Sequence, residues 1–185
     1  MTSPATERIL MAVQDILVSD GIEDVTIRNV AKAAGVSLGA VQHHYRTKDD
    51  LLMAAMDRVS GQFMERVMSV TTPTATPTAN LAAVCHILGG VDDESRTASV
   101  VWLAFASKAA TSELIGRAHQ ESWRLLEGGL TELLRQVDPV LGSDDAATLM
   151  ALLDGIAIAR ATEAERMTRE RAHRIINALL EHFEP

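Results

Sequence analysis

Residues 26–52 read TIRNVAKAAGVSLGAVQHHYRTKDDLL, and the spacing of small, apolar and capping residues in this stretch predicts two short helices. Thr26 can cap the first helix, and Gly35 ends it after about two turns. Ser37 can cap the second helix, which we expect to run to about Tyr45. The inward-facing residues of the first helix are Ile27, Val30, Ala31 and Ala34. Two helices joined by a short turn that contains glycine are typical of a helix-turn-helix.

The second helix of this pair has one side anchored and one side free. We expect Val36, Val41 and Tyr45 to anchor it to the core, with Val36 as a buried spacer. The residues that remain for solvent or a DNA groove are Ser37, Leu38, Gly39, Ala40, Gln42, His43 and His44. The small side chains of Gly39 and Ala40 would let the backbone approach DNA closely.

Each exposed residue type suits a particular DNA contact. Gln42 can pair with adenine through two hydrogen bonds, and Leu38 or Ala40 can touch a thymine methyl group. Thr26, Ser37 and the helix N-termini can hydrogen-bond phosphates. Lys48 can bind a phosphate from the start of the next helix.

The distribution of charge is compatible with a DNA contact at this segment. The net charge is −8, which on its own argues against nucleic acid as a partner. Between residues 26 and 48, however, there is no carboxylate, and the basic residues are Arg28, Lys32, Arg46 and Lys48. One basic segment on an acidic chain fits DNA binding at that segment, although a chance gap in the acidic residues would give the same pattern.

The stretch resembles the DNA-binding head of the TetR family of transcriptional regulators. The family pattern is Thr-x-Arg-x-Ile-Ala-x-x-Ala-Gly-Val-Ser-x-Gly-x-x-Tyr-x-His-Phe-x-x-Lys-x-x-Leu, and Arg8 and Gly21 also stand where such proteins have them. The resemblance implies a base or backbone contact for Arg28, a backbone contact for Lys48, and DNA-facing positions for Leu38, Gly39, Ala40, Gln42, His43 and His44.

The chain departs from that pattern at two positions. Gln42 replaces a tyrosine that often contacts phosphate in the family, and this resembles a subgroup of choline-responsive regulators of the BetI kind. Tyr45 replaces the usual phenylalanine, and we interpret it as a core residue. His43 and His44 could also be surface histidines. A metal site is disfavoured because adjacent helical residues point about 100° apart and no second pair of ligands is present.

The rest of the chain predicts an all-α protein of about nine helices. The first helix should begin at Ser3-Pro4 and end before Gly21, and a long helix should begin at Lys48. Residues 71–80, TTPTATPTAN, predict a connector because proline breaks a helix interior. Later helices are expected near 80–89, 93–110, 112–137, 143–162 and 168–183, with Asp92 or Asp93, Ser143 and Thr168 as caps. We divide the chain into a DNA-binding domain, 1–47, and a ligand-binding and dimerisation domain, 48–185.

The last two helices indicate a homodimer. Residues 146–159 are apolar except at Thr148, Asp154 and Gly155, and a helix that is apolar nearly all round must be buried on more than one side. The final helix adds a second stripe, formed by Ile175, Ile176, Leu179, Leu180 and Phe183. The family resemblance implies that these helices form a four-helix bundle between two chains, although both stripes could instead be intramolecular core.

A ligand pocket is implied by the resemblance alone. The candidate lining residues are Trp102, Phe105, His119, Trp123, Met150 and Asp154. Tryptophan faces with a carboxylate could hold a cation, but the same side chains could simply fill the core. Cys85, beside His86, is interpreted as a buried structural cysteine rather than a thiol sensor.

Composition bounds the remaining alternatives. The hydrophobic fraction is 47% with only 3% aromatic residues, which favours helices over strands. We expect a soluble, cytoplasmic chain, because no signal peptide and no apolar run of membrane-spanning length is present. No nucleophilic triad, phosphate-binding glycine loop or paired metal-ligand motif appears, so we expect no catalytic residues, no metal and no cofactor.

The sequence therefore predicts a repressor that binds a palindromic operator as a homodimer and is released by a small-molecule inducer. The alternatives are a regulator of the same fold without a ligand, and an activator with the same head. Neither the inducer nor the operator can be identified from the sequence.

Overall fold

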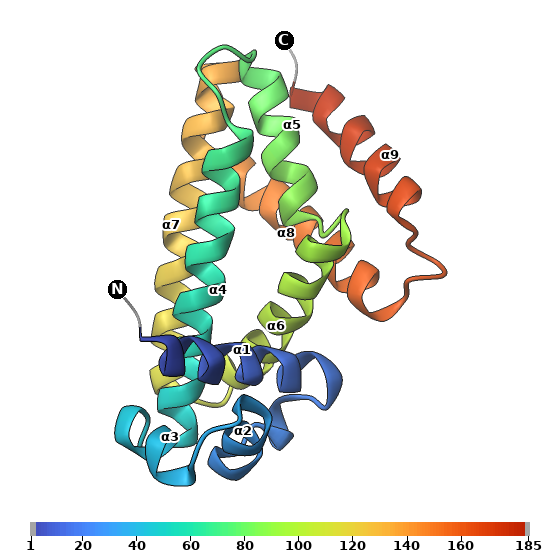
Figure 1. The fold of residues 1–185 in the computed structure, drawn as a ribbon. Coiled ribbons are helices and arrows are strands. Elements are labelled where there is room, and N and C mark those ends of the chain that lie inside the picture. The colour runs from blue at the N-terminus through green and yellow to red at the C-terminus, as the bar shows by residue number, and fades with distance from the viewer. Residues whose placement is uncertain (1–2, 184–185) are drawn as a thin grey trace. The chain divides into compact units, whose positions relative to one another are not determined.

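The computed structural model describes residues 3–183, which form nine α-helices, two short 3₁₀ segments and no strand. Figure 1 shows the helices in chain order, and their bounds are α1 Pro4–Ser19, α2 Ile27–Ala34, α3 Leu38–His44, α4 Lys48–Val70, α5 Pro77–Leu88, α6 Asp93–Ala109, α7 Glu113–Val137, α8 Ser143–Thr162 and α9 Arg169–Leu180. The 3₁₀ segments are Ile22–Asp24 and Glu181–Phe183. The all-α prediction is confirmed. None of the helices in this part of the chain combines the length and apolar character needed to cross a bilayer.

The chain forms two compact units. The first contains the residues up to Gln62 together with Val100–His119, and the second contains Phe63–Ser99 and the chain from Gln120 on. The unit boundary falls within α4, α6 and α7, so each of these helices belongs partly to both units.

The first unit is built around the buried face of α1. Pro4 takes the first helical position, where its missing N–H costs nothing, and Ser3 accepts a hydrogen bond from the Thr6 amide at 3.2 Å. The apolar residues at helical spacing are all buried, as predicted: Ile9, Leu10, Val13, Ile16 and Leu17. Contacts of α1 with α2, and of α2 with α3, assemble the head.

The second unit has one continuous apolar core. Its largest fully buried side chains include Leu81, Leu130, Leu134, Leu149, Leu153 and Ile176, from α5, α7, α8 and α9. The buried Arg160 side chain lies among these helices and donates hydrogen bonds to the carbonyls of Gly90, Val91 and Met167. The Arg160 side chain therefore joins the residues that follow α5 to both ends of the α8–α9 loop.

Two helix starts differ from the prediction. The connector is shorter than expected, because α5 begins at Pro77 rather than near residue 80, with Thr76 as its N-cap. Proline is excluded from helix interiors but fits the first turn, and this distinction was missed. The N-cap of α8 is Gly142 rather than Ser143, and the Asp145 carboxylate accepts a hydrogen bond from the Gly142 amide at 2.8 Å.

The C-terminal helix is also shorter than predicted. α9 ends at Leu180, and the residues that follow form a 3₁₀ turn, Glu181–Phe183.

Candidate nucleic-acid interface

The helix-turn-helix has the caps and the turn that the sequence predicts. Thr26 Oγ1 accepts a hydrogen bond from the Asn29 amide at 3.1 Å, and Ser37 Oγ accepts one from the Ala40 amide at 3.1 Å. Gly35 ends α2 in the left-handed conformation, with φ of 64°, which favours glycine over residues with a Cβ. The turn between the helices is therefore fixed by local hydrogen bonds and by glycine.

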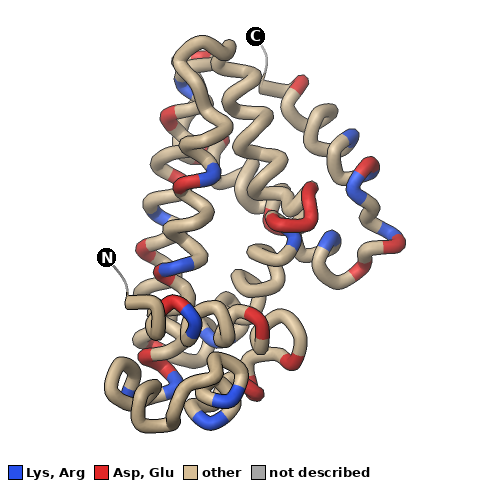
Figure 2. Tube along the Cα trace, in the orientation of Figure 1, with Lys and Arg blue, Asp and Glu red and all other residues tan. Residues whose placement is uncertain are grey.

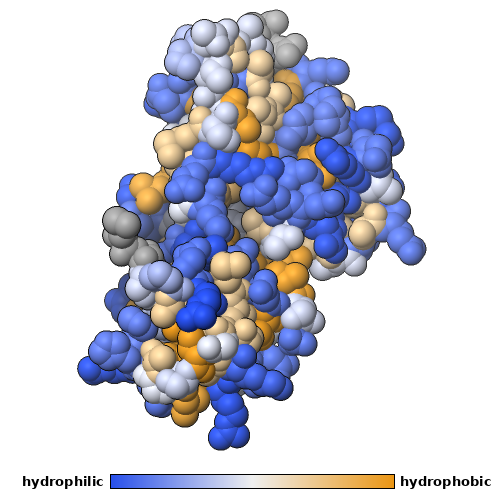
Figure 3. All heavy atoms as spheres, viewed as in Figure 1, coloured by the Kyte–Doolittle hydropathy of each residue, from blue (hydrophilic) through white to orange (hydrophobic). Residues whose placement is uncertain are grey.

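α3 is anchored on one side only. Val41 is its one buried residue, while Leu38 is 46% exposed. Val36 and Tyr45, predicted as further anchors, are only half-buried, so the prediction of Val36 as a buried spacer was wrong. Burial raises the pKa of the Tyr45 phenol. Figure 3 shows hydrophobic residues, in orange, at the surface of this part of the molecule.

The residues predicted to contact DNA lie at or near the surface. Those classed as exposed are Thr26, Arg28, Ser37, Leu38, Gly39, Gln42, His43 and His44, and those half-buried are Ala40 and Lys48. A Cβ added at Gly39 would meet nothing within 4 Å. The His43 and His44 rings lie edge to face, with centroids 5.1 Å apart. The exposed side of α3 is thus available to a DNA groove.

Lys48 has a partner that sequence reasoning missed. Its Nζ lies 3.4 Å from the Glu23 carbonyl and 3.5 Å from Glu23 Oε2. Glu23 belongs to the 3₁₀ segment Ile22–Asp24, which no periodicity in the sequence indicates. A phosphate that binds Lys48 would therefore meet an acidic neighbour. Figure 2 shows where the basic and acidic segments lie along the head.

The start of α4 is held by a reciprocal cap. Asp50 Oδ2 accepts hydrogen bonds from the amides of Arg46 and Thr47 at 3.0 and 2.9 Å, and Thr47 Oγ1 accepts one from the Asp50 amide at 3.0 Å. The hydrogen bonds from Thr47 lower the pKa of the Asp50 carboxyl. Because this cap fixes the turn after α3, it also fixes the position of Lys48 relative to α3.

The six residues predicted to line a ligand pocket divide between the two units. Trp102, Phe105 and His119 belong to the first, where the Trp102 and His119 rings lie edge to face at 5.3 Å. Burial lowers the pKa of His119. The second unit holds Trp123, which packs against the core, with Met150 and Asp154. A pocket formed by these six residues stays a prediction.

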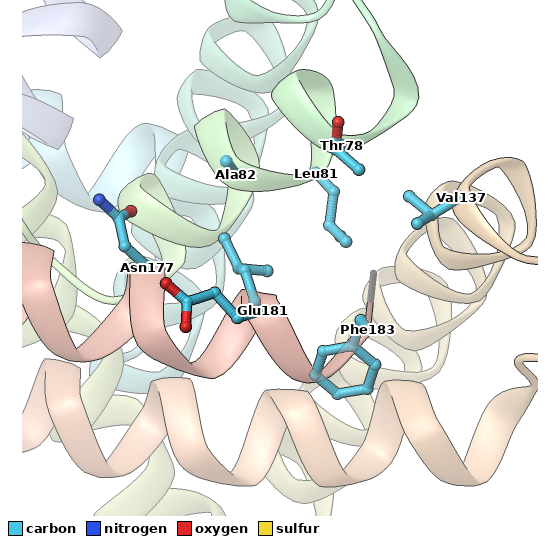
Figure 4. A pocket seen from close by; sticks show the side chains of 8 residues that line it. Thr78, Leu81, Ala82, Val137, Asn177, Glu181 and Phe183 are labelled. Carbon is cyan, nitrogen blue, oxygen red and sulfur yellow. The ribbon is translucent and has the colours of Figure 1, made fainter. Parts of the chain in front are cut away.

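The second unit contains, among its hollows, two cavities that none of those six residues lines. The smaller, about 280 Å³, is bounded by α5, the end of α7 and α9, and Figure 4 shows Glu181 and Phe183 among its lining side chains. The larger, about 440 Å³, is bounded by α4, α5, α7 and the α4–α5 connector, and we call it the α4–α7 groove. Its lining includes Phe63, Met64, Val67, Leu125, Gly129 and Gln136.

Sequence reasoning missed the α4–α7 groove because its lining residues have ordinary helical spacing. Nothing in the pattern of Phe63, Val67 or Leu126 distinguishes a cavity wall from a filled core. Cys85, in contrast, is buried as predicted, and burial raises the pKa of its thiol to about 12, which keeps the thiol protonated and unreactive.

Sequence comparisons connect this architecture to known proteins. Residues 9–55 match the sequence model of the bacterial regulatory proteins of the tetR family, and residues 77–184 match that of the BetI-type transcriptional repressor C-terminal domain. The chain belongs to the TetR family of transcriptional regulators. The HTH-type transcriptional regulator BetI of Escherichia coli K12 is 29% identical over 99% of this chain and 93% of its own length.

Solved structures of transcriptional regulators have the same fold. A transcriptional regulator from Rhodococcus sp. Rha1 superposes with a TM-score of 0.89 at 28% identity, covering 98% of this chain and 96% of that one. A transcriptional regulator from Saccharomonospora viridis in complex with choline also gives 0.89, at 20% identity, covering 98% and 97%. These likenesses show the shared fold, and the sequence matches make the chain a TetR-family regulator with a BetI-type C-terminal domain.

Proposed function

We propose that this TetR-family chain is a repressor that binds a palindromic operator as a homodimer. The observation that supports this most directly is the exposed side of α3, on which Leu38, Gln42 and His43 are exposed beside a single buried anchor, Val41. The side chains of α3 would contact bases, while Thr26, Arg28 and Lys48 would contact the phosphate backbone. We propose that it acts in the cytoplasm, where its operator lies.

The exposed side of α8 supports the homodimer. Between Ala147 and Ile158 none of the fully exposed residues is charged, the nearest carboxylate being that of the half-buried Asp154, and Leu152 and Ile158 are each 46% exposed. Ala147, Ala151 and Gly155 follow one another at intervals of four residues, so they form a row of small side chains on one helix face. Such a row lets a second helix approach closely. We infer that α8 of a second copy covers this face, together with the exposed Ile175 of α9.

We further propose that a small molecule bound within the second unit lowers the affinity for DNA. Residues of α4 line the α4–α7 groove, and the same continuous helix begins at Lys48. A ligand that shifts α4 would therefore also shift the Lys48 end. It would release DNA only if it bound the free shape more tightly than the DNA-bound shape.

Titration against DNA from the region upstream of the protein's own gene, at two salt concentrations, tests the DNA-binding proposal. We expect nanomolar binding of one fragment, and we expect Gln42→Ala to weaken that fragment more than unrelated DNA. Lys48→Ala should weaken binding to all DNA, and it should reduce the salt slope by about 0.9 for each phosphate that the variant no longer neutralises.

Arg124→Ala provides the matched control for Lys48→Ala, because it also removes a cation that is paired with a glutamate, Glu121, on an exposed side of α7. It should leave DNA affinity unchanged. If wild type prefers no fragment, or if Arg124→Ala weakens binding as much as Lys48→Ala, then α3 and Lys48 do not form the interface.

A further inference from the structure

We propose that His86 of α5 and His173 of α9 form a pH-sensitive contact, which holds α9 on the core while the rings are neutral and releases it in acid. We call these two residues the histidine pair. Their ring centroids lie 4.4 Å apart, and the ring planes make an angle of only 8°, so the imidazoles are stacked face to face. They join two helices that pack on each other within the second unit (Figure 1).

His86 is the half-buried member of the histidine pair. Its Nε2 is shielded from solvent and has no hydrogen-bond partner among the described residues. A protonated imidazole carries N–H on both nitrogens, so protonation would leave a charged donor at Nε2 without an acceptor, which is unfavourable. Burial and, after it, the charge of His173 lower the pKa of His86, an effect that the Asn177 side chain offsets only in part.

His173 is the exposed member, and its polar neighbour does not fix its charge. The Asn177 side-chain nitrogen lies 3.3 Å from His173 Nδ1. An amide can present either its NH₂ group or its oxygen by turning over, so Asn177 can hydrogen-bond His173 in both charge states. When both rings are protonated, however, two like charges face each other where water is partly excluded, and they repel.

No carboxylate neutralises the histidine pair. Both α8 and α9 pack on α5, and their other ionisable side chains are Asp144, Asp145, Asp154, Arg160, Arg169, Glu170, Arg171 and Arg174, followed by Glu181 and His182 after α9. Among the described residues, no carboxylate lies within ion-pair distance of either imidazole. Arg160 is occupied by backbone carbonyls. Asp154 responds to pH in the opposite direction, because protonation in acid removes a buried charge.

Neutral pH therefore favours attachment of α9, and acid favours its release. Above the ordinary pKa of 6.5, His86 is neutral whether α9 is attached or released, so the contact is fully present. As pH falls through that value, His86 takes up a proton more readily when α9 is released than when the rings are stacked. Attachment then weakens until the pH has fallen below the lowered pKa of the stacked ring.

Cys85, the single cysteine of the chain, is a natural probe for this release. It is fully buried, and it lies four residues before Gly89, on the same face of α5. Ile176 of α9 packs so closely on that face that a Cβ added at Gly89 would lie 2.5 Å from Ile176 Cδ1. Release of α9 would remove Ile176 and expose the thiol.

The rate at which methyl methanethiosulfonate modifies Cys85, measured at pH 5.0 and 7.5, tests the proposal. Dividing the rate in urea by the rate in native buffer at each pH gives a protection factor, which corrects for the pH dependence of the thiol reaction itself. We expect the wild-type protection factor to be at least tenfold lower at pH 5.0. His173→Phe keeps a flat ring against His86 but cannot be charged, so its protection factor should fall less than threefold.

His182→Phe is the matched control. It makes the same chemical change at another exposed histidine, which stacks on none of the described rings, and it should keep the wild-type drop. The proposal is overturned if wild-type protection does not fall at pH 5.0, if His173→Phe keeps the full drop, or if His182→Phe loses it. It is also overturned if helix content in circular dichroism falls in parallel with protection, since the whole chain would then be unfolding.

Release of α9 has a consequence for the dimer, and this consequence alone rests on the proposed function. α9 carries the exposed Ile175, which belongs to the face that we propose a second copy covers. The dimer should therefore dissociate more readily at pH 5.0 than at pH 7.5 in sedimentation. If Cys85 loses protection while the mass stays that of a dimer, the histidine pair stands and only its link to the dimer fails. A monomer at both pH values would overturn the proposed dimer and leave the histidine pair intact.

Discussion

At the scale of single residues, Asp154 gives the clearest dependence on pH. Burial raises the pKa of its carboxyl to about 6, from an ordinary value of 3.8, so folding favours the protonated form. Well below pH 3.8 the carboxyl is protonated in both states and costs nothing. As pH rises from about 4 to 6 the unfolded chain ionises first, so this group lowers the free energy of unfolding, and above about pH 6 the full penalty remains.

Asp154→Asn should therefore raise the free energy of unfolding at pH 7.5, by about 1 kcal/mol after allowance for the partial exposure of the side chain, and should change it little at pH 4. Urea unfolding at the two pH values measures this difference. Asp57→Asn makes the same chemical change at an exposed position of α4 and shows what the loss of one negative charge does by itself. A stabilisation that is equal at both pH values would contradict the assignment.

Residue-level prediction from the sequence succeeded where the interaction is local. The caps at Thr26 and Ser37 involve residues three apart, and their side-chain chemistry identifies them without a structure. The contact of Lys48 with Glu23 joins residues twenty-five positions apart, one of them in a 3₁₀ turn. Nothing in the sequence pattern indicates such a pair, so the acidic neighbour of a predicted phosphate contact was found only in the structure.

At the scale of helices, the end of α8 depends on one buried cation. Arg160 is 5% exposed, and its Nε and Nη1 donate to the carbonyls of Gly90 and Met167 at 3.2 and 3.0 Å. A basic residue in the last turn of a helix usually indicates a solvated end that complements the helix dipole. The sequence pattern thus suggests an exposed residue, whereas the structure gives Arg160 the role of joining α5 to the α8–α9 loop.

Arg160→Met keeps most of the side-chain volume but leaves those carbonyls without donors, so it should cost about 2–3 kcal/mol of unfolding free energy. Arg96→Met is the comparison, because the half-exposed Arg96 side chain also donates to two carbonyls, those of Arg160 and Ala161. Its loss should cost about 1 kcal/mol, since water can replace it. Equal losses for the two variants, measured by urea unfolding, would show that burial of Arg160 does not matter.

In the described residues helix existence was predictable, but several helix ends and the cavities were not. Apolar periodicity located all nine helices of the described residues, while the start of α5 was misplaced because Pro77 was taken as a breaker rather than as a first-turn residue. The α4–α7 groove depends on how far apart two helices lie. Spacing along one helix contains no information on that distance, so the groove lining had no sequence signal.

At the scale of the whole molecule, the row formed by Ala147, Ala151 and Gly155 has no explanation within one chain. A mid-helix glycine costs about 1 kcal/mol relative to alanine, and a Cβ added at Gly155 would meet nothing within 4 Å. A single chain would therefore be more stable with a larger residue there. The glycine is useful only if another surface approaches that face closely, which is what a second copy of α8 would do.

Gly155→Leu separates these two situations because it acts in opposite directions on them. In the single chain the leucine enters open space and favours the helix, so thermal stability should not fall. In a dimer it would hold the two α8 helices apart, and we expect the dimer dissociation constant to rise at least tenfold, or about 1.4 kcal/mol. Sedimentation equilibrium measures the constant, with Gly128→Leu, an open glycine on α7, as the control. Operator affinity should fall as the dimer is lost, since two heads must contact two half-sites. If Gly155→Leu leaves the dimer intact, the partner surface lies elsewhere, and the row of small residues on α8 needs another explanation.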